Sequence, residues 1–192
     1  DPLRADVAER PALAARVELV LLARALGPAE ETVTCDPSRR RIGLRVRVDR
    51  FDDPARLRTW ARHALGHAED SLDPSFGFEP GWEQRTDGPT AERLHVLWDA
   101  SVDGRAARAG RPVFGTTRHD HADRLAALLP PGHGPVAAAL VERCWTGDRP
   151  NFPTLRCWAA APLAAAGVLT RDGDPAAPET ADPAAVRLLP GG

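Results

Sequence analysis

One amphipathic segment, residues 54–72, constrains the fold of this chain more than any other. Asp53-Pro54 supplies a side-chain cap followed by a first-turn proline, and Asp73-Pro74 follows the end of the segment, so a helix is favoured between them. The apolar residues recur at three- and four-residue steps and form a single stripe. They are Leu57, Trp60, Ala61, Ala64, Leu65, Ala68 and Leu72.

The segments before this helix predict another helix and then a β-hairpin. Residues 11–26 are rich in Ala, Leu and Val and end at Gly27-Pro28, which predicts a largely buried helix. Residues 32–35 are β-prone, and apolar side chains alternate with charged ones over residues 41–49. This alternation is typical of a strand with one apolar face, and we expect its charged face to be solvated.

The segments after the helix predict a mainly helical remainder. Residues 75–89 carry turn signals and predict a loop, of a length that is uncommon unless the loop has a function. Residues 92–102 favour a helix capped by Thr90 and ended by Gly104. Three further helices are expected, over residues 120–129, 135–145 and 154–166. Pro162 is expected to bend the last of them.

Composition places the chain among globular domains of ordinary size. It has 192 residues, of which 43% are hydrophobic and 27% charged, so one domain with a packed core is expected. We assign residues 1–168 to a single α+β domain and residues 169–192 to a flexible tail or a short wing-like hairpin. The net charge of −2 supplies no basic field for nucleic acid. No apolar run reaches the roughly 18 to 20 residues of a membrane span.

The cysteines and the first residue bear on the compartment. Cys35, Cys144 and Cys157 contain no C-x-x-C pair, which indicates neither a disulfide framework nor a four-cysteine zinc site. We expect reduced thiols, with Cys144 and Cys157 packed in the core. The missing initiator methionine predicts a fragment, a processed form or a trimmed chain, and we expect a cytoplasmic location.

Two histidines carry the sharpest chemical signal in the sequence. His63 and His67 are four residues apart, which places both imidazoles on one face of the helix, one turn from each other. That face lies away from the centre of the apolar stripe, so they are not ordinary core residues. Asp70 falls on the same face and Asp73 at the helix end. Two histidines and a carboxylate are the donors of a three-ligand zinc site with a fourth position open for water.

Residues 63–67, HALGH, and the segment that follows resemble the active-site helix of the HExxH zinc metallopeptidases, the zincins. In that family the two histidines bind zinc, and the glutamate after the first histidine activates the metal-bound water. His63 and His67 match the ligands, but Ala64 stands at the glutamate position. The resemblance implies a zincin-like α+β fold, with an early β-hairpin, then the active-site helix and a mainly helical C-terminal part. It also implies a peptide or protein as substrate or partner.

The resemblance leaves the third metal ligand open among several carboxylates. Zincins that draw an acidic ligand from a downstream helix point to Asp99, with Asp103 in reserve. Zincins with a compact ligand set point to Asp73, six residues beyond His67, although that subgroup has a glycine where this chain has Asp70. We prefer Asp99, and so predict a zinc site formed by His63, His67 and Asp99.

Ala64 changes what such a site is expected to do. A positioned general base contributes roughly 10² to 10⁴ in rate, and alanine cannot supply one. The sequence therefore predicts a zinc-metallopeptidase-like domain whose hydrolysis is impaired or absent, with no catalytic residue assigned. The loop around residues 76–82 is expected to border its cleft.

Two other functions are kept as alternatives. One is a protein-interaction or regulatory module that binds no metal. The other is a winged-helix DNA-binding regulator formed by residues 163–173 and 186–191, against which the sparse local basic charge argues. The cluster His119-Asp120-His121 is interpreted as a polar cap at a helix N-terminus.

Overall fold

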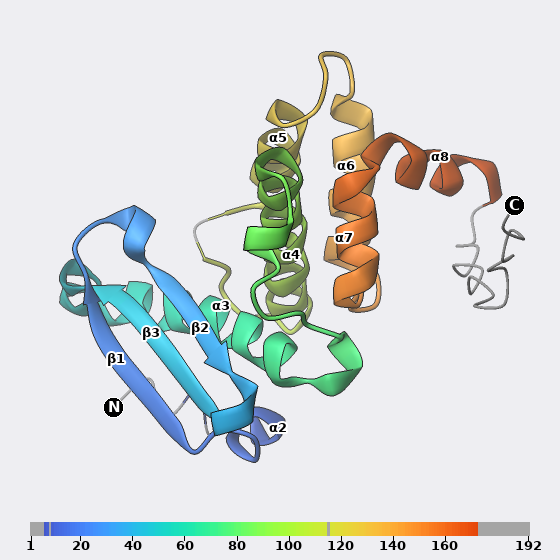
Figure 1. Ribbon diagram of the computed structural model, residues 1–192. Coiled ribbons are helices and arrows are strands. Elements are labelled where there is room, and N and C mark those ends of the chain that lie inside the picture. The colour runs from blue at the N-terminus through green and yellow to red at the C-terminus, as the bar shows by residue number, and fades with distance from the viewer. Residues whose placement is uncertain (1–5, 8, 115, 173–192) are drawn as a thin grey trace, which may run out of the picture.

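The computed structural model describes residues 6–7, 9–114 and 116–172, and shows an α+β fold (Figure 1). A small sheet lies at one end of the molecule, α3 crosses one face of it, and the later helices stand beside α3. The strands are β1 (Leu19–Ala25), β2 (Thr32–Asp36) and β3 (Arg41–Arg47). The helices are α2 (Pro11–Ala14), α3 (Pro54–Leu72), α4 (Gly88–Arg108), α5 (Arg118–Ala127), α6 (Gly134–Thr146), α7 (Phe152–Ala160) and α8 (Pro162–Asp172).

The sheet has the order β1-β3-β2, so β3 is its central strand. The predicted hairpin is confirmed, because β2 pairs with β3 in antiparallel fashion. The alternation along β3 buries Ile42, Leu44 and Val46 against α3, while the alternate positions, Arg41, Gly43, Arg45 and Arg47, face the other side. The apolar stripe of α3 is buried as expected. The Asp53 carboxylate accepts hydrogen bonds from the backbone amides of Ala55 and Arg56 and so caps the helix.

The helix predicted over residues 11–26 is wrong beyond its first turn. α2 ends at Ala14, and residues 19–25 form β1, which pairs in parallel with β3. An apolar run of this length does not distinguish a helix from a strand by its period. The open edge of β3 supplies hydrogen-bond partners for this backbone, and that tertiary contact decides the outcome.

α4 is longer than predicted at both ends. It is capped by Asp87, whose carboxylate accepts the Thr90 amide, and it continues through Gly104 to Arg108. Gly104 lies inside the helix, at a position where a Cβ would be 2.6 Å from the Trp145 Cα. The glycine therefore permits close packing of α4 against α6 instead of ending the helix.

The C-terminal helices follow the prediction with two corrections. Pro162 does not bend a single helix; α7 ends at Ala160 and Pro162 begins α8, because a proline fits the first turn of a helix. Cys144 is buried as expected, but Cys157 is exposed, and the three cysteines are free. The proposed wing at residues 186–191 lies outside the described residues. Within the described ranges, no helix combines the length and the apolar character that crossing a membrane requires.

Among the described residues two hydrophobic clusters make up the core, and α3 and α4 cross where the clusters meet. One cluster joins the sheet to α3, and the other joins α4, α5, α6 and α7 around Phe76, Trp98 and Phe152. The helices approach closely at Gly66, where a Cβ would lie 2.6 Å from Val102 Cγ1. A side chain at position 66 would force them apart.

A buried ion-pair network fixes this crossing. The fully buried Asp70 of α3 accepts hydrogen bonds from Trp98 Nε1 (2.8 Å) and Arg105 Nη2 (2.8 Å) of α4. Arg149, between α6 and α7, contacts Asp70 at 3.3 Å and also pairs with Asp73. Breaking a buried pair of this kind costs about 3–5 kcal/mol, so Asp70 holds the elements together.

The Asp73–Arg149 pair predicts a measurable loss of stability in acid. The hydrogen bond from Arg149, with further bonds from Ser75, lowers the pKa of Asp73 from 3.8 to about 2. Because the folded pKa is depressed, the contribution is present above pH 3.8 and is lost as the pH falls toward 2. We expect Asp73→Asn to lower the free energy of unfolding by about 1–2 kcal/mol at neutral pH.

Asparagine keeps the capping hydrogen bonds of Asp73, so the variant tests the charge. Urea unfolding measured at several pH values in that interval should show that the free energy of unfolding depends less on pH in Asp73→Asn than in the parent. Glu142→Gln, which removes an exposed partner of Arg118, is the control. An unchanged pH dependence in Asp73→Asn would contradict the assignment.

Candidate metal centre

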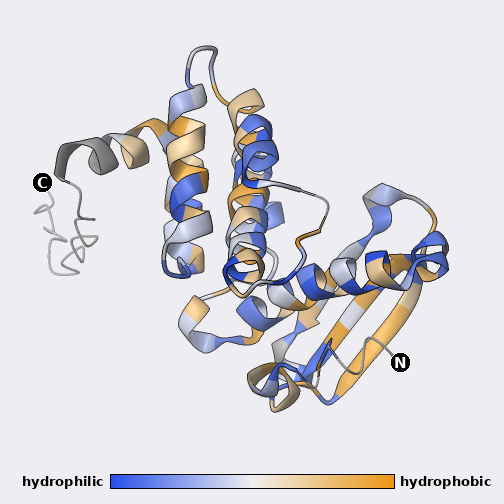
Figure 2. Ribbon diagram, turned by 180° about the vertical axis from the view of Figure 1, so that it is seen from behind, coloured by the Kyte–Doolittle hydropathy of each residue, from blue (hydrophilic) through white to orange (hydrophobic). Residues whose placement is uncertain are grey.

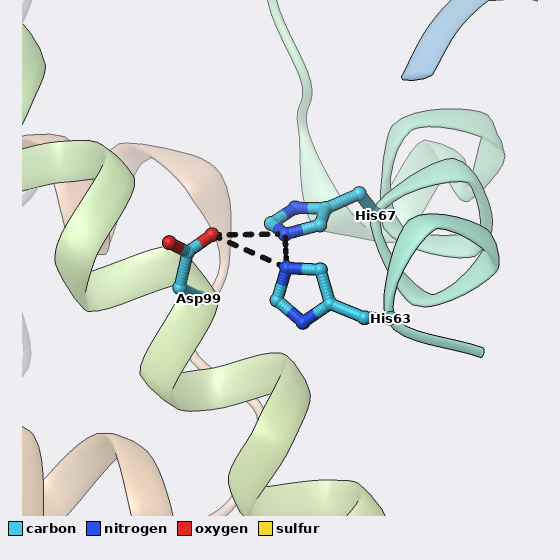
Figure 3. Close-up of side chains that lie close together, drawn as sticks. All are labelled: His63, His67 and Asp99. Atoms are coloured by element: carbon cyan, nitrogen blue, oxygen red, sulfur yellow. Dashed lines mark hydrogen bonds and ion pairs between the residues drawn. The ribbon is translucent and has the colours of Figure 1, made fainter. Parts of the chain in front are cut away.

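Three side chains from α3 and α4 converge at the crossing of these helices (Figure 3). His63 and His67 extend from successive turns of α3, and Asp99 extends toward them from α4. His67 Nε2 lies 3.1 Å from His63 Nε2 and 3.1 Å from Asp99 Oδ1. His63 Nε2 lies 3.5 Å from the same carboxylate oxygen. The structure thus brings together the three residues that the sequence predicts as ligands.

The spacing of these three atoms fits a tetrahedral metal ion. Protein ligands bind zinc at about 2.0–2.1 Å, which in a tetrahedron places neighbouring donors about 3.3–3.4 Å apart. The separations of 3.1, 3.1 and 3.5 Å match three edges of such a tetrahedron. The group His63, His67 and Asp99 could therefore hold a metal ion.

A second layer of hydrogen bonds orients His63. Its Nδ1 lies 2.8 Å from Asp103 Oδ1, which leaves Nε2 directed at His67 and Asp99. The other oxygen of Asp103 lies 3.0 Å from Nε2 of His121, on α5. Asp103 and His121 are 2% and 1% exposed. A carboxylate behind a ligating histidine fixes its tautomer and raises its basicity.

The charges of the cluster are unevenly distributed between the histidines. Burial opposes a charge on His63, but Asp103 and Asp99 outweigh it and raise the His63 pKa to about 10. Burial lowers the pKa of His67, and the charge on His63 adds to this effect. Burial would raise the pKa of Asp99, yet the two imidazoles bring it well below its usual range. Asp99 also lies 3.5 Å from the guanidinium of Arg124, so one imidazolium and one guanidinium balance the two carboxylates. A metal ion at this site would have to replace the proton on His63 Nε2.

A cleft of about 520 Å³ opens in front of this cluster. Both histidines and Asp99 line it, together with four of the five residues of the edge strand β2. The loop after α3 contributes Phe78, Pro80, Gly81 and Trp82, as the sequence analysis expects of this loop. The remaining walls combine the aromatic residues Trp60, Trp98 and Phe114 with polar residues that include Glu31, Glu83 and Gln84. The donors are therefore accessible to a molecule larger than water.

Ala64 lies at the boundary between this cleft and the core. It is 4% exposed, packs with the cluster between α3 and the sheet, and lines the cleft beside the histidines. No proton-transfer group is present at this position. A longer side chain here would extend toward the space in front of the donors.

The other carboxylates proposed from the sequence have different roles. Asp70 binds Arg105 and Trp98, and Asp73 binds Arg149, so neither joins the histidines. Asp103 contacts the far nitrogen of His63 instead of the three-donor group. Each of these carboxylates forms ion pairs with other side chains. The spacing of residues along the helix cannot indicate those partners.

Sequence reasoning missed the role of His121. The capping interpretation holds for its neighbour, because Asp120 and Thr117 form a capping box at the start of α5. His121 itself is buried against Asp103. The only signal in the sequence is that Asp99 and Asp103 are four apart and share a helix face. Which side chain meets Asp103 from α5 depends on tertiary packing.

Comparisons with protein-family models, curated proteins and solved structures find no match to this chain. A functional conclusion therefore rests on the geometry of the donors and the cleft.

Proposed function

We propose that this chain is a zinc-binding domain related to the HExxH metallopeptidases, in which Ala64 impairs or abolishes hydrolysis. The observation that carries the proposal is the convergence of His63 Nε2, His67 Nε2 and Asp99 Oδ1 at tetrahedral spacing. Two imidazoles and one carboxylate form a three-ligand site of the kind found in zinc hydrolases, with one position open. This open position would face the cleft.

The order of elements around the donors also supports the proposal. The strand β3 precedes the histidine helix, and the acidic ligand comes from the next long helix, α4. This is the order expected from zincins that take their third ligand from a downstream helix. The Asp103 carboxylate behind His63 adds the second-layer contact that zinc-bound histidines ordinarily make.

The cleft favours an extended peptide as the molecule bound there. β2 is an edge strand, and its residues Thr32, Val33, Thr34 and Cys35 line the cleft. An edge strand offers backbone donors and acceptors to a peptide that adds as a further strand. The aromatic walls offer apolar contacts for its side chains.

The residues divide the chemistry as follows. Zinc, when bound, supplies Lewis acidity and lowers the pKa of water. His63 and His67 present Nε2 to the ion, and Asp103 keeps the His63 ring in the required tautomer. Ala64 can neither accept nor deliver a proton, so the general-base step has no residue at its expected position. Binding of metal and peptide is retained, while turnover is impaired or absent.

Zinc content is the first test of the proposal. We expect about one zinc ion per chain by elemental analysis of protein purified without chelators. His63→Ala and Asp99→Ala each remove one of three protein ligands and should abolish stoichiometric binding. The control is His119→Ala, because His119 is 85% exposed and lies on α5 outside the cluster. The cobalt-substituted protein should show the visible absorption of a tetrahedral site. Absence of zinc and cobalt binding in the folded parent would exclude the metal site and favour the interaction module.

Restoring the glutamate tests the assignment of Ala64. We expect Ala64→Glu to raise cleavage of a peptide library, followed by mass spectrometry, by roughly 10² to 10⁴ over the parent. Ala64→Gln has nearly the same size but no basic carboxylate, so it is the matched control and should stay at the parent rate. A zinc-loaded Ala64→Glu protein without activity would show that the site binds metal without being a degenerate peptidase.

Asp103 is expected to act as a positioning residue. Asp103→Asn keeps a hydrogen-bond acceptor near His63 Nδ1 but removes the charge, and should weaken zinc binding by about 10- to 100-fold. Competition with a chromophoric chelator measures the affinity, and circular dichroism checks the fold. Asp123→Asn, at an exposed position of α5, is the control. An unchanged zinc affinity in Asp103→Asn would rule out the second-layer role.

A further inference from the structure

The strand β1 leaves an apolar surface uncovered at the outer edge of the sheet. Leu19, Leu21 and Leu22 are 41%, 52% and 53% exposed, although each belongs to a regular strand. Leu19 and Leu21 are in register with Arg41 and Gly43 and so lie on the face of the sheet away from α3, whereas Leu22 is in register with Leu44 on the face toward α3. Figure 2 shows β1 as a hydrophobic strand along the border of the molecule.

The backbone of β1 is also available along this edge. β1 pairs with β3 on one side only, and no described residue pairs with the other side. Proteins usually protect such edges with charged residues, prolines or bulges. Within residues 19–25 the only charge is Arg24, and neither a proline nor a bulge interrupts the pairing with β3. An edge that is apolar, regular and open is a template for another strand.

We propose that two copies of this chain form a homodimer by antiparallel pairing of their β1 strands. The pairing would join the two sheets into one continuous sheet with the order β2-β3-β1-β1-β3-β2. A two-fold axis at Leu21 pairs Leu21 with Leu21 on one face of the joined sheet and Leu22 with Val20 on the other. Such an interface is self-complementary, as two-fold symmetry requires.

The charges flanking β1 specify this register and a second copy as the occupant. With the axis at Leu21, Glu18 of one copy lies opposite Arg24 of the other, so the symmetry creates two ion pairs. A shift of the axis to Leu22 would place Arg24 opposite Val20 and leave both charges unpaired. Arg24 has no side-chain partner among the described residues, and Glu18 pairs only with the exposed Arg40. The strand thus carries its own complementary charges.

The size of the surface determines the strength expected. A single pair of seven-residue strands buries less than the roughly 800 Å² per partner of a standard interface. Interfaces at this lower end belong to weak and transient complexes. We therefore expect a monomer–dimer equilibrium with a micromolar dissociation constant.

Sedimentation equilibrium of the full chain over a range of concentrations tests the proposal. The parent should fit a monomer–dimer equilibrium, and Leu21→Lys should raise the dissociation constant about tenfold or more, because two like charges meet at the axis. Leu163→Lys makes the same change at a 44% exposed leucine of α8 and should leave the equilibrium unchanged. Circular dichroism establishes that each variant is folded.

A charge exchange tests the register. Arg24→Glu should weaken the dimer by about fivefold or more, because it places two acidic side chains opposite each other. The double variant Glu18→Arg with Arg24→Glu restores opposite charges and should recover the parent affinity. A parent that stays monomeric at every concentration overturns the proposal. So does a dimer whose affinity is the same in Leu21→Lys, since its interface would lie elsewhere.

Discussion

The close crossing of α3 and α4 is the contact on which the rest of this structure depends. Gly66 allows the helices to approach, and Asp70 ties α3 to Trp98 and Arg105 of α4 with buried hydrogen bonds. The three candidate ligands lie on the same two helices. Their spacing is therefore a property of the crossing, and small shifts of either helix would alter all three distances together. A glycine and a buried carboxylate outside the donor group thus determine the geometry of the site.

The local features of the sequence were sufficient for the parts of the fold that local interactions decide. The apolar stripe and the Asp53 cap define α3, and the alternation over residues 41–49 defines β3. The grouping of His63, His67 and Asp99 was also predictable, because a four-residue spacing fixes the histidine face and the resemblance supplied a carboxylate from a downstream helix. The first two of these inferences need only one helix or one hairpin to be correct, whereas the placement of Asp99 opposite the histidines came from the resemblance.

The parts that could not be predicted depend on contacts between distant segments. The sequence of β1 is equally compatible with a helix, and only the pairing with the free edge of β3 makes it a strand. Gly104 looks like a helix end until Trp145 is placed against it. Asp70 shares a helix face with the histidines in projection, but Arg105 and Arg149 draw its carboxylate away. His121 reaches Asp103 only through the packing of α5 on α4. Residue spacing predicts which face of a helix a side chain occupies, but it does not predict which residue of another segment contacts that side chain.

The donor group joins the two hydrophobic clusters and therefore bears on the stability of the fold. His63 and His67 belong to the helix that packs on the sheet, whereas Asp99 belongs to the helix at the centre of the second cluster. An ion held by all three would bind only when both clusters are folded and correctly placed. By mass action it would stabilise that combined state over any form in which one cluster has opened. A metal ion at the donor group would therefore couple the unfolding of the two halves of the molecule.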